Sequence, residues 1–285
     1  MGMVGTVGLV LHPQRDSKKA IDVILRWAAD KGATVLGLPE EVGRIDCTAV
    51  PVDADALVER ADLLVGLGGD GTMLRTMRLL AGRPTPILGV NLGKLGFLAE
   101  IGVDELAETL SAIDRHEYTI EPRMAIRSAV NGTEVTAFND IALVRIPGCG
   151  LTNVAVTPAG SPFVRYSSDA VIVATTTGST AYSFSAGGPI VSPRVEAVLV
   201  VAAAAHSAFN RALVLPADEE VTLTVLPSSG RLAVEVDGNV MGHLGPGDSI
   251  TVTAWPGAAK VVRLGTTFYE RARRKLRVDG SLEPC

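Results

Sequence analysis

The first part of the chain alternates short apolar runs with stretches in which apolar residues recur at helical spacing. Residues 4–11 form an apolar run that predicts a buried strand, and further strands are predicted over 33–38, 62–67 and 86–93. A helix is predicted over 16–32, where one face carries Ala20, Ile21, Ile24, Leu25 and Ala28, and Gly32 ends the pattern. Two more helices are predicted over 71–82 and 103–113. Alternation of this kind predicts a parallel sheet with helices on its faces.

After about residue 121 the pattern changes to strands rich in valine and threonine. Asn131-Gly132 lies between two strand-like runs and is a strong signal for a β-hairpin. Turns rich in glycine and proline separate the further predicted strands, which cover 219–226, 231–236, 248–255 and 259–265. This part of the chain is predicted to form a β-sandwich.

The segment 268–278 is predicted to be helical and is strongly basic. We interpret it as a solvated helix face, or as a tail that packs back on the first part of the chain. The predicted fold is therefore an α/β Rossmann-like domain over 1–121 followed by an all-β sandwich-type domain over 122–261. The tail of about 262–285 is expected to rejoin the first domain, and a length of 285 residues suits two domains.

Composition excludes several classes of partner. A net charge of −5 and aromatic residues at only 4% argue against a surface for nucleic acid. The apolar run 197–205 is too short to span a bilayer, and the first residues lack the basic region of a signal peptide. We expect neither nucleic acid nor a membrane as a partner.

Cysteine and histidine give no sign of a metal centre. The three cysteines are scattered and the four histidines lack metal-ligand spacing, so we predict no protein metal site and no disulfide framework. Free cysteines are typical of a reducing cytoplasm, which is the expected location.

A glycine-rich turn with an acid inside it follows the predicted strand 62–67. Gly66, Gly68 and Gly71 match the dinucleotide-binding pattern G-x-G-x-x-G, but the acid expected about 20 residues later is missing, as is a Walker A lysine. Glycines and the start of a helix favour phosphate, to which Arg75 can add a cation. Asp70 can then hold Mg²⁺ or accept a proton from an attacking hydroxyl. The alternative is that Asp70 only caps the helix that follows.

Two further segments carry polar groups inside apolar surroundings. The segment 175–191 combines a glycine turn, several hydroxyls and the aromatic ring of Tyr182, which can stack on adenine. Its alternative interpretation is a surface loop. Asn139 and Asp140 interrupt an apolar strand, where they mark either a ligand site or an exposed edge or bulge.

These segments together resemble the NAD kinase family. The resemblance is carried, in chain order, by GGDGT (68–72), NLGKLGFLAE (91–100), FND (138–140) and TTTGSTAYSFSAGGPIV (175–191). It implies a kinase that transfers the γ-phosphate of ATP to the 2′-hydroxyl of the adenosine ribose of NAD. It also implies Mg²⁺ with ATP as the cofactor, and a homodimer or homotetramer.

The resemblance implies a role for each matching residue. Asp70 is the implied catalytic base, and the implied ligands of ATP and NAD are Gly68, Gly69, Gly71, Arg75, Phe97, Asn139, Asp140, Asp169, Thr180, Ala181, Tyr182, Ser183 and Ser185. Within this set, Asn139 and Asp140 bind hydroxyls of NAD, and Asp169 lies on the nicotinamide side. The purely structural alternatives are that Phe97 is a core residue and that Asp169 is a capping or turn residue. Asp237-Gly238 is interpreted as a hairpin turn.

The sequence departs from the family at several positions on the acceptor side. Ser167 replaces a common arginine, Ala170 a glycine and Thr176 a proline, and two further prolines are missing near Ala202 and Ala212. These departures leave two alternatives open. One is a related kinase with another nucleotide or ribosyl acceptor, and the other is an NAD-binding sensor without catalysis.

Overall fold

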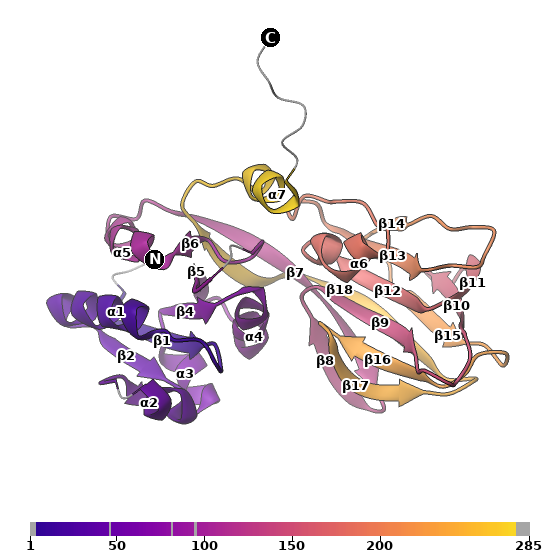
Figure 1. Cartoon of the computed structure of the whole chain (residues 1–285), viewed down its shortest axis with the longest axis horizontal. Helices are drawn as coiled ribbons and strands as arrows, with labels where there is room; N and C mark the ends of the chain where they lie inside the picture. Colours follow the sequence, from indigo (N-terminus) through magenta and orange to yellow (C-terminus); the bar gives the residue numbers. More distant parts are fainter. Residues whose placement is uncertain (1–3, 46, 81, 94–95, 278–285) are drawn as a thin grey trace, which may run out of the picture. The chain divides into compact units, whose positions relative to one another are not determined.

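The computed structural model describes residues 4–45, 47–80, 82–93 and 96–277 (Figure 1). The chain forms two compact units, one made of Met1–Pro122 with Ala259–Cys285 and the other of Arg123–Ala258. The first unit is α/β and the second is all-β, which confirms the predicted fold class.

The first unit is built on a parallel sheet. Its strand order is β18 (Ser249–Arg263), β5 (Pro86–Asn91), β4 (Leu63–Gly68), β1 (Thr6–Leu11), β2 (Thr34–Gly37) and β3 (Val50–Pro51), with β6 (Ile101–Gly102) also paired to β5. The chain starts at β1, moves outward through β2 and β3, and then returns to the other side of β1 for β4 and β5. The carboxyl ends of β1 and β4 therefore flank the point where the strand order reverses, which is where open α/β sheets bind their ligands.

Helices connect these strands. They are α1 (Lys18–Lys31), α2 (Pro39–Ile45), α3 (Ala54–Arg60), α4 (Asp70–Leu80), a short 3₁₀ turn (Val103–Glu105), α5 (Leu106–Asp114) and the late helix α7 (Phe268–Leu276). Gly32, in the left-handed conformation at φ +65°, ends α1 as predicted. The sequence pattern did not predict α2 and α3, because seven residues are too few to show a helical period.

The second unit contains two antiparallel sheets. One has the order β11 (Val164–Ser168), β10 (Thr152–Pro158), β15 (Val221–Val225), β18; the other has the order β14 (Leu213–Pro216), β13 (Ala197–Ala203), β12 (Ala170–Thr175), β9 (Asp140–Arg145), β16 (Leu232–Val236), β17 (Asn239–Leu244). Valine, leucine and isoleucine side chains from both sheets form one apolar core. This confirms the predicted sandwich.

A predicted hairpin and a predicted apolar strand of the second unit both have the expected form. Asn131 and Gly132 join β7 (Thr119–Val130) to β8 (Thr133–Ala137) with φ angles of +50° and +81°, as a tight hairpin requires. The strand β12 is buried on both faces, because a short helix, α6 (Tyr182–Ser185), and its flanking segment cover the face turned away from the sandwich core. That double burial explains the continuous apolar run 170–174.

The end of the chain differs from the prediction in its strands and bears on the two alternatives for its helix. The segments 248–255 and 259–265 were expected to be separate strands, but they belong to the single strand β18, in which Gly257 takes a φ of +66°. Helix α7 was interpreted as a solvated face or as a tail that packs back on the first part of the chain, and it has features of both: Arg271 is only 2% exposed, while Arg273, Arg274 and Lys275 are exposed. Arg271 pairs with Glu100, which belongs to the first unit.

Candidate active site

The glycine turn lies at the carboxyl end of β4, where Gly68 ends the strand and Asp70 begins α4. A Cβ atom at Gly68 would lie 2.1 Å from Oγ1 of Thr72, so only glycine allows the helix to start this close to the strand. Gly71 is exposed and a Cβ there would meet nothing within 4 Å. The turn thus presents backbone amides and a helix N-terminus, a combination that binds phosphate.

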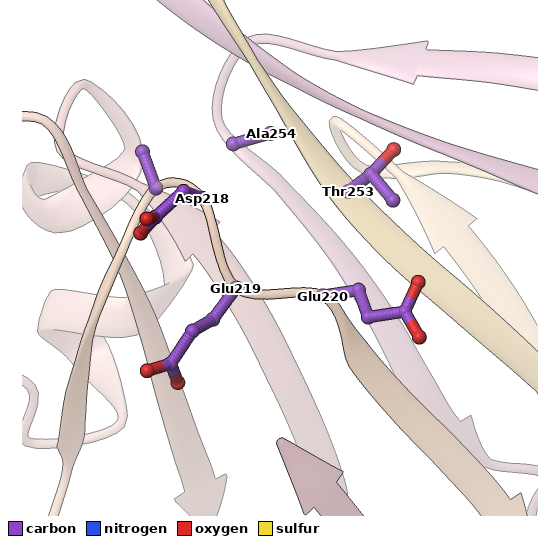
Figure 2. Close-up of a pocket in the computed structure, with 6 residues that line it drawn as sticks. Asp218, Glu219, Glu220, Thr253 and Ala254 are labelled. Carbon is purple, nitrogen blue, oxygen red and sulfur yellow. The ribbon is translucent and has the colours of Figure 1, made fainter. Parts of the chain in front are cut away.

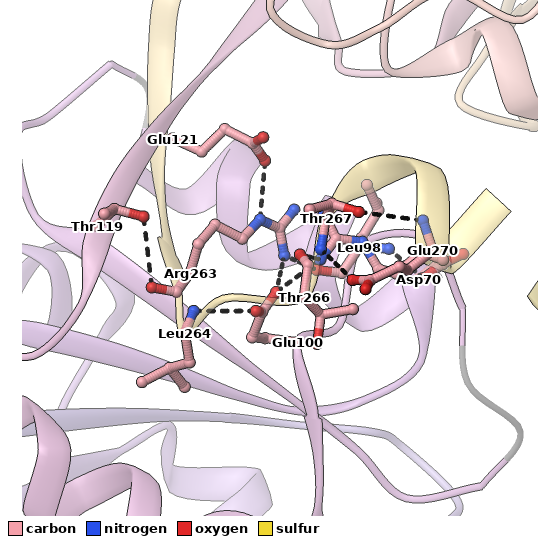
Figure 3. A network of polar contacts seen from close by, with 11 residues as sticks. Asp70, Leu98, Glu100, Thr119, Glu121, Arg263, Leu264, Thr266, Thr267 and Glu270 are labelled. Carbon is pink, nitrogen blue, oxygen red and sulfur yellow. Dashed lines mark hydrogen bonds and ion pairs between the residues drawn. The ribbon is translucent and has the colours of Figure 1, made fainter.

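Asp70 does not use its carboxylate to cap its own helix. Its Oδ2 atom accepts a hydrogen bond from the backbone N–H of Phe97 at 3.0 Å. Its Oδ1 atom accepts one from the backbone N–H of Leu98, also at 3.0 Å (Figure 3). The contact needs Gly96, because a Cβ at that position would lie 2.0 Å from Oδ1 of Asp70. The sequence did not reveal this role of Gly96, although the glycine lies inside the motif 91–100.

A buried ionic network lies behind the loop that holds Asp70. Glu100 accepts hydrogen bonds from Arg263 at 2.6 Å and from Arg271 at 3.0 Å, and all three side chains are almost fully buried. Arg263 also donates to the carbonyl of Leu98 at 3.3 Å and to Glu121 at 2.8 Å (Figure 3). The end of β18 and helix α7 therefore support the same loop that positions Asp70.

Arg75 has a protein partner in this structure. Its guanidinium pairs with the buried carboxylate of Glu41 on α2 and donates to the carbonyl of Leu11 at 3.1 Å. Glu41 in turn accepts a hydrogen bond from the N–H of Leu11 at 2.7 Å. The phosphate-binding role of Arg75 therefore stays a prediction. A phosphate would have to compete for the guanidinium with Glu41 on α2, a helix that the sequence pattern did not predict.

In the second unit, the predicted pair Asn139 and Asp140 lies at the start of β9, in a turn that Asp237 organises. The carboxylate of Asp237 accepts hydrogen bonds from the backbone N–H groups of Phe138, Asn139 and Asp140 at 3.2, 2.7 and 3.2 Å. Asp237 also donates its own N–H to the carbonyl of Asp140 at 2.9 Å. Asp237-Gly238 was predicted only as a hairpin turn. The sequence did not reveal that the carboxylate of Asp237 also binds the backbone amides of residues 138–140.

Asp140 is almost fully buried beside other acids. The pKa of Asp140 is raised to about 7, first by burial and then by the nearby charges of Asp237 and Glu235, against a hydrogen bond from the backbone N–H of Tyr182 that lowers it. The carboxyl group thus changes charge near neutral pH. Carboxyls with such a pKa cluster at functional sites.

The segment 175–191 packs directly on this pair. The N–H of Thr175 donates to the carbonyl of Asn139 at 2.9 Å, and a Cβ at Gly178 would lie only 2.1 Å from the same oxygen. With the Tyr182 contact to Asp140, the structure brings together two motifs that the sequence analysis treated separately. The alternative of a surface loop does not hold for the first part of the segment, since all residues of 175–179 are buried. In the second part, Phe184, Ser185, Gly187, Pro189 and Ile190 are exposed.

The predicted hydroxyl ligands differ in their surroundings. Thr180 donates to the carbonyl of Thr177 at 3.3 Å, and the exposed Ser185 lies 3.5 Å from the carbonyl of Ala181. Ala181 is half-buried between the 3₁₀ turn Gly178–Thr180 and α6. Ser183 is fully buried, and its Oγ atom would lie 2.4 Å from a Cβ at Gly188. Ser183 thus faces the interior of its own loop, unlike the other predicted hydroxyls.

Asp169 and Tyr182 are linked electrostatically. Asp169 immediately precedes β12 and pairs with Arg145 at 2.9 Å, with 44% of its side chain exposed. Burial raises the pKa of the Tyr182 hydroxyl, and the charges of Glu235, Asp140 and Asp169 raise it further. Asp169 therefore belongs to the electrostatic surroundings of the Tyr182 ring.

A hollow elsewhere in the second unit is lined by acids rather than by predicted site residues. Figure 2 shows it, with lining residues Ala217, Asp218, Glu219, Glu220, Thr253 and Ala254. Among the described residues, no group of three or more histidine, cysteine or acidic side chains is arranged to hold a metal ion. In the same part of the chain, no helix is long and apolar enough to cross a bilayer.

Comparison with known proteins links both units to one family. Residues 7–118 match the family model of the ATP-NAD kinase N-terminal domain, and residues 138–264 match that of the ATP-NAD kinase C-terminal domain. NAD kinase 1 of Streptomyces avermitilis is 38% identical, and the alignment covers 96% of this chain and 87% of that protein. The NAD kinase of Moorella thermoacetica is 37% identical, with 96% of this chain and 90% of that protein covered.

Solved structures agree with these matches. The structure of yeast NADH kinase complexed with NADH is similar with a TM-score of 0.86 and 25% identity, covering 100% of this chain and 91% of that one. An NAD kinase from Archaeoglobus fulgidus shares the fold with a TM-score of 0.73 and 24% identity, covering 96% of this chain and 100% of that one. With the carboxylate-bearing glycine turn of the first unit and the Asp140–Tyr182 contact of the second, these matches show that the chain belongs to the ATP-NAD kinase family.

Proposed function

We propose that this protein transfers the γ-phosphate of ATP to the 2′-hydroxyl of the adenosine ribose of NAD and so produces NADP. Family membership supports the reaction class. The single observation that carries the catalytic assignment is the carboxylate of Asp70, which begins α4 at the phosphate-type turn and is held by the amides of Phe97 and Leu98 rather than by its own helix.

On the donor side, the turn of Gly68, Gly69 and Gly71 binds the phosphates of ATP with its backbone amides and the N-terminus of α4. Mg²⁺ arrives with ATP, since Mg²⁺ is commonly held by substrate phosphates, water and one or two carboxylates. The only carboxylate in the turn is that of Asp70, which fits a metal held chiefly by the nucleotide. The ion neutralises charge on the phosphates when bound.

Asp70 is the general base. A carboxylate has about four lone-pair directions, and one hydrogen bond from a backbone amide to each oxygen leaves acceptor capacity on both. Asp70 accepts the proton of the 2′-hydroxyl as the 2′-oxygen bonds to the γ-phosphorus, and the bond from that phosphorus to the bridging oxygen of ADP breaks. ADP leaves with the bonding electrons. General base catalysis of this kind supplies about 10²–10⁴-fold acceleration.

On the acceptor side, Asn139, Asp140 and Tyr182 bind the adenosine part of NAD. The ionised carboxylate of Asp140 accepts hydrogen bonds from ribose hydroxyls, and the Tyr182 ring stacks on adenine. Thr180, Ala181 and Ser185 belong to the same segment as Tyr182 and also contact the dinucleotide. Phe97 and Asp169 contact its remaining part. Ser183 acts through its backbone, because its side chain is buried against Gly188.

The departures from the family pattern that fall at Ala170 and Thr176 do not argue against NAD as the acceptor. Ala170 and Thr176 are both buried, so these changes alter packing beneath the site rather than the groups that a ligand would meet. The N–H of Ser167, on β11, donates to the hydroxyl of Ser207 at 3.0 Å. The catalytic carboxylate is present, which favours an enzyme over a sensor.

We further propose a division of labour in which domain 1–121 with its C-terminal tail binds the donor and domain 122–261 binds the acceptor. The free thiols of Cys47 and Cys149 support a reducing cytoplasm, while Cys285 lies outside the described residues. A homodimer or homotetramer is expected from the family resemblance, and light scattering of the purified chain measures it.

The experiment that tests the proposed function uses the purified full chain with Mg²⁺ and ATP. NAD, NADH, adenosine and a panel of adenine nucleotides are supplied as acceptors, and the products are identified by mass spectrometry. We expect NAD to gain one phosphate on its adenosine ribose. Phosphorylation of another acceptor in preference to NAD would show that the chain is a related kinase, and binding of NAD without any transfer would show that it is a sensor.

A further inference from the structure

The loop after β1 carries a positively charged residue, Arg15, that the sequence analysis did not single out. Strands β1 and β4 are neighbours in the sheet, with Leu11 opposite Leu67, and β4 is paired with β5 so that Gly68 lies opposite Asn91. The loops that follow β1, β4 and β5 therefore leave the same edge of the sheet. This edge includes the reversal of strand order at which ligands bind.

The guanidinium of Arg15 lies against the glycines of the two neighbouring loops. Its Nη1 atom would be 2.7 Å from a Cβ at Gly93, in the loop after β5, and 4.0 Å from a Cβ at Gly69, in the phosphate-type turn. A side chain at Gly93 would crowd the guanidinium, whereas the distance to Gly69 is that of ordinary van der Waals contact, so Arg15 reaches the phosphate-type turn across Gly93. Within the described residues, no carboxylate pairs with Arg15 and no hydrogen bond occupies its guanidinium.

Several contacts fix the loop that carries Arg15. The Nδ1 atom of His12 accepts hydrogen bonds from the backbone N–H groups of Gln14 and Arg15, both at 3.1 Å. Arg44 on α2 donates to the carbonyls of His12, at 2.7 Å, and Pro13. Burial lowers the pKa of His12, and the charges of Arg15, Arg44 and Arg75 lower it further, which favours the neutral ring that can accept those hydrogen bonds.

The charges around this loop are predominantly positive. Three guanidinium groups lie close enough to affect His12, and Glu41 is bound to only one of them, Arg75. Among the described residues the guanidinium of Arg15 has no partner, and it is held beside the phosphate-type turn and the N-terminus of α4. Such a guanidinium is suited to a phosphate group, because its planar N–H donors match the phosphate oxygens.

We infer that Arg15 binds the β- and γ-phosphates of the ATP donor and is held in place for this by His12 and Arg44. The inference rests on the proposed function, which places the donor phosphates at the Gly68–Gly71 turn. It assigns to Arg15 the role first predicted for Arg75, whose guanidinium is bound to Glu41. His12 acts as a positioning residue and touches no substrate.

The test compares Arg15→Ala and Arg15→Lys with a matched control, Arg26→Ala. Arg26 is an exposed arginine on α1 whose Nε donates to the carbonyl of Asp22 within the same helix, at 3.1 Å. Initial rates with varied ATP and varied NAD give kcat and both KM values for each variant. Calorimetry without NAD then gives the dissociation constants of ATP, ADP and AMP.

For Arg15→Ala we expect the KM for ATP to rise at least about tenfold, because hydrogen bonds between charged groups are the strong ones. The KM for NAD should stay within about twofold of wild type, as a donor-side contact predicts. Affinity for ATP and ADP should fall while affinity for AMP, which lacks both outer phosphates, is unchanged. Arg15→Lys should recover part of the loss, and Arg26→Ala should behave as wild type.

An unchanged KM for ATP in Arg15→Ala, or an equal loss of AMP affinity, would overturn the inference. So would an equal effect of Arg26→Ala, which would indicate a general charge effect. If the wild type forms NADP and Arg15→Ala keeps its KM for ATP, only the inference fails. If the wild type forms no NADP, the proposed function fails, and the calorimetry still decides whether Arg15 binds the outer phosphates.

Discussion

Asp70 and Gly96 lie on different loops of the first unit, yet the carboxylate of Asp70 rests against Gly96 so closely that a Cβ there would be 2.0 Å from Oδ1. The two amides that follow Gly96 each donate to one carboxylate oxygen of Asp70. The position of the proposed base is therefore set by the absence of a side chain at a residue that takes no part in the chemistry.

Gly96→Ala is expected to lower kcat by about 100-fold or more, because a displacement of about 1 Å in a catalytic group costs that much. The new methyl group must push Asp70 away or pull the amides of Phe97 and Leu98 out of reach. Steady-state kinetics with ATP and NAD measure the effect. The matched control is Gly43→Ala on α2, where a Cβ meets nothing within 4 Å and activity should be unchanged. Wild-type kcat in Gly96→Ala would contradict the role given to this contact.

Asp70→Asn is expected to reduce kcat by about 10²–10⁴-fold, since an amide cannot accept the hydroxyl proton. The asparagine NH₂ group also cannot accept from one of the two backbone amides, which costs about 1–3 kcal/mol of stability. Kinetics, calorimetry with NAD and thermal unfolding separate these effects. NAD binding should be retained. A kcat within about tenfold of wild type would show that Asp70 only anchors the loop.

Asp140→Asn should change how stability depends on pH. The pKa of Asp140 is about 7 in the folded protein and the ordinary value is 3.8, so its contribution to stability is fully present below about pH 4 and is lost as pH rises through 7. Each pKa unit corresponds to about 1.4 kcal/mol. The variant should therefore gain stability relative to wild type between pH 5 and pH 8, measured by urea unfolding. A constant difference across this range would argue against the raised pKa.

The same carboxyl group should make NAD binding pH-dependent. Ionised Asp140 accepts ribose hydroxyls better than the neutral acid, so the KM for NAD should fall as pH rises from 6 to 8 while the KM for ATP changes little. Burial is the largest influence on the pKa of this group, and Asp237, Glu235 and the Tyr182 amide, which face it, contribute the rest. In Asp140→Asn the fall should disappear. A fall that persists in this variant would assign the titration to another group.

Arg271→Met is expected to destabilise the first unit by about 3–5 kcal/mol, the usual cost of removing one partner from a buried ionic network. Glu100 would keep its bond to Arg263 but lose the one from α7. Because Arg263 also donates to the carbonyl of Leu98, kcat should fall as well. The control is Arg274→Ala on the exposed side of α7, which should change neither quantity. Equal stability of the two variants would argue against the network.

Local sequence signals predicted the elements that carry the site. The strand–glycine turn–helix arrangement around Asp70, the Asn131-Gly132 hairpin and the end of α1 at Gly32 all depend on residues adjacent in sequence. The apolar strand β12 was likewise visible because a strand buried on both faces has no polar alternation. The fold class followed from these elements.

The partners of the site residues were not predictable, because they depend on contacts between distant segments. Helical spacing made Arg75 a candidate phosphate ligand, but Glu41 binds it from α2, a helix too short to show a periodic pattern. The basic helix at the end of the chain gave no sign that Arg271 alone would be buried against Glu100. Asp237 was recognised as a turn residue, while its carboxylate acts on three amides far away in the sequence.

The first unit is discontinuous in sequence, and this has a consequence for synthesis on the ribosome. The Pro86–Ile87 part of β5 pairs with Lys260–Val261 of β18, and Glu100 meets both of its arginines only after residue 271 has been translated. The contiguous second unit is complete before either event. A nascent chain therefore carries a sheet edge open to wrong pairing, and a carboxylate without its counter-charges, until residues 260–271 have been translated.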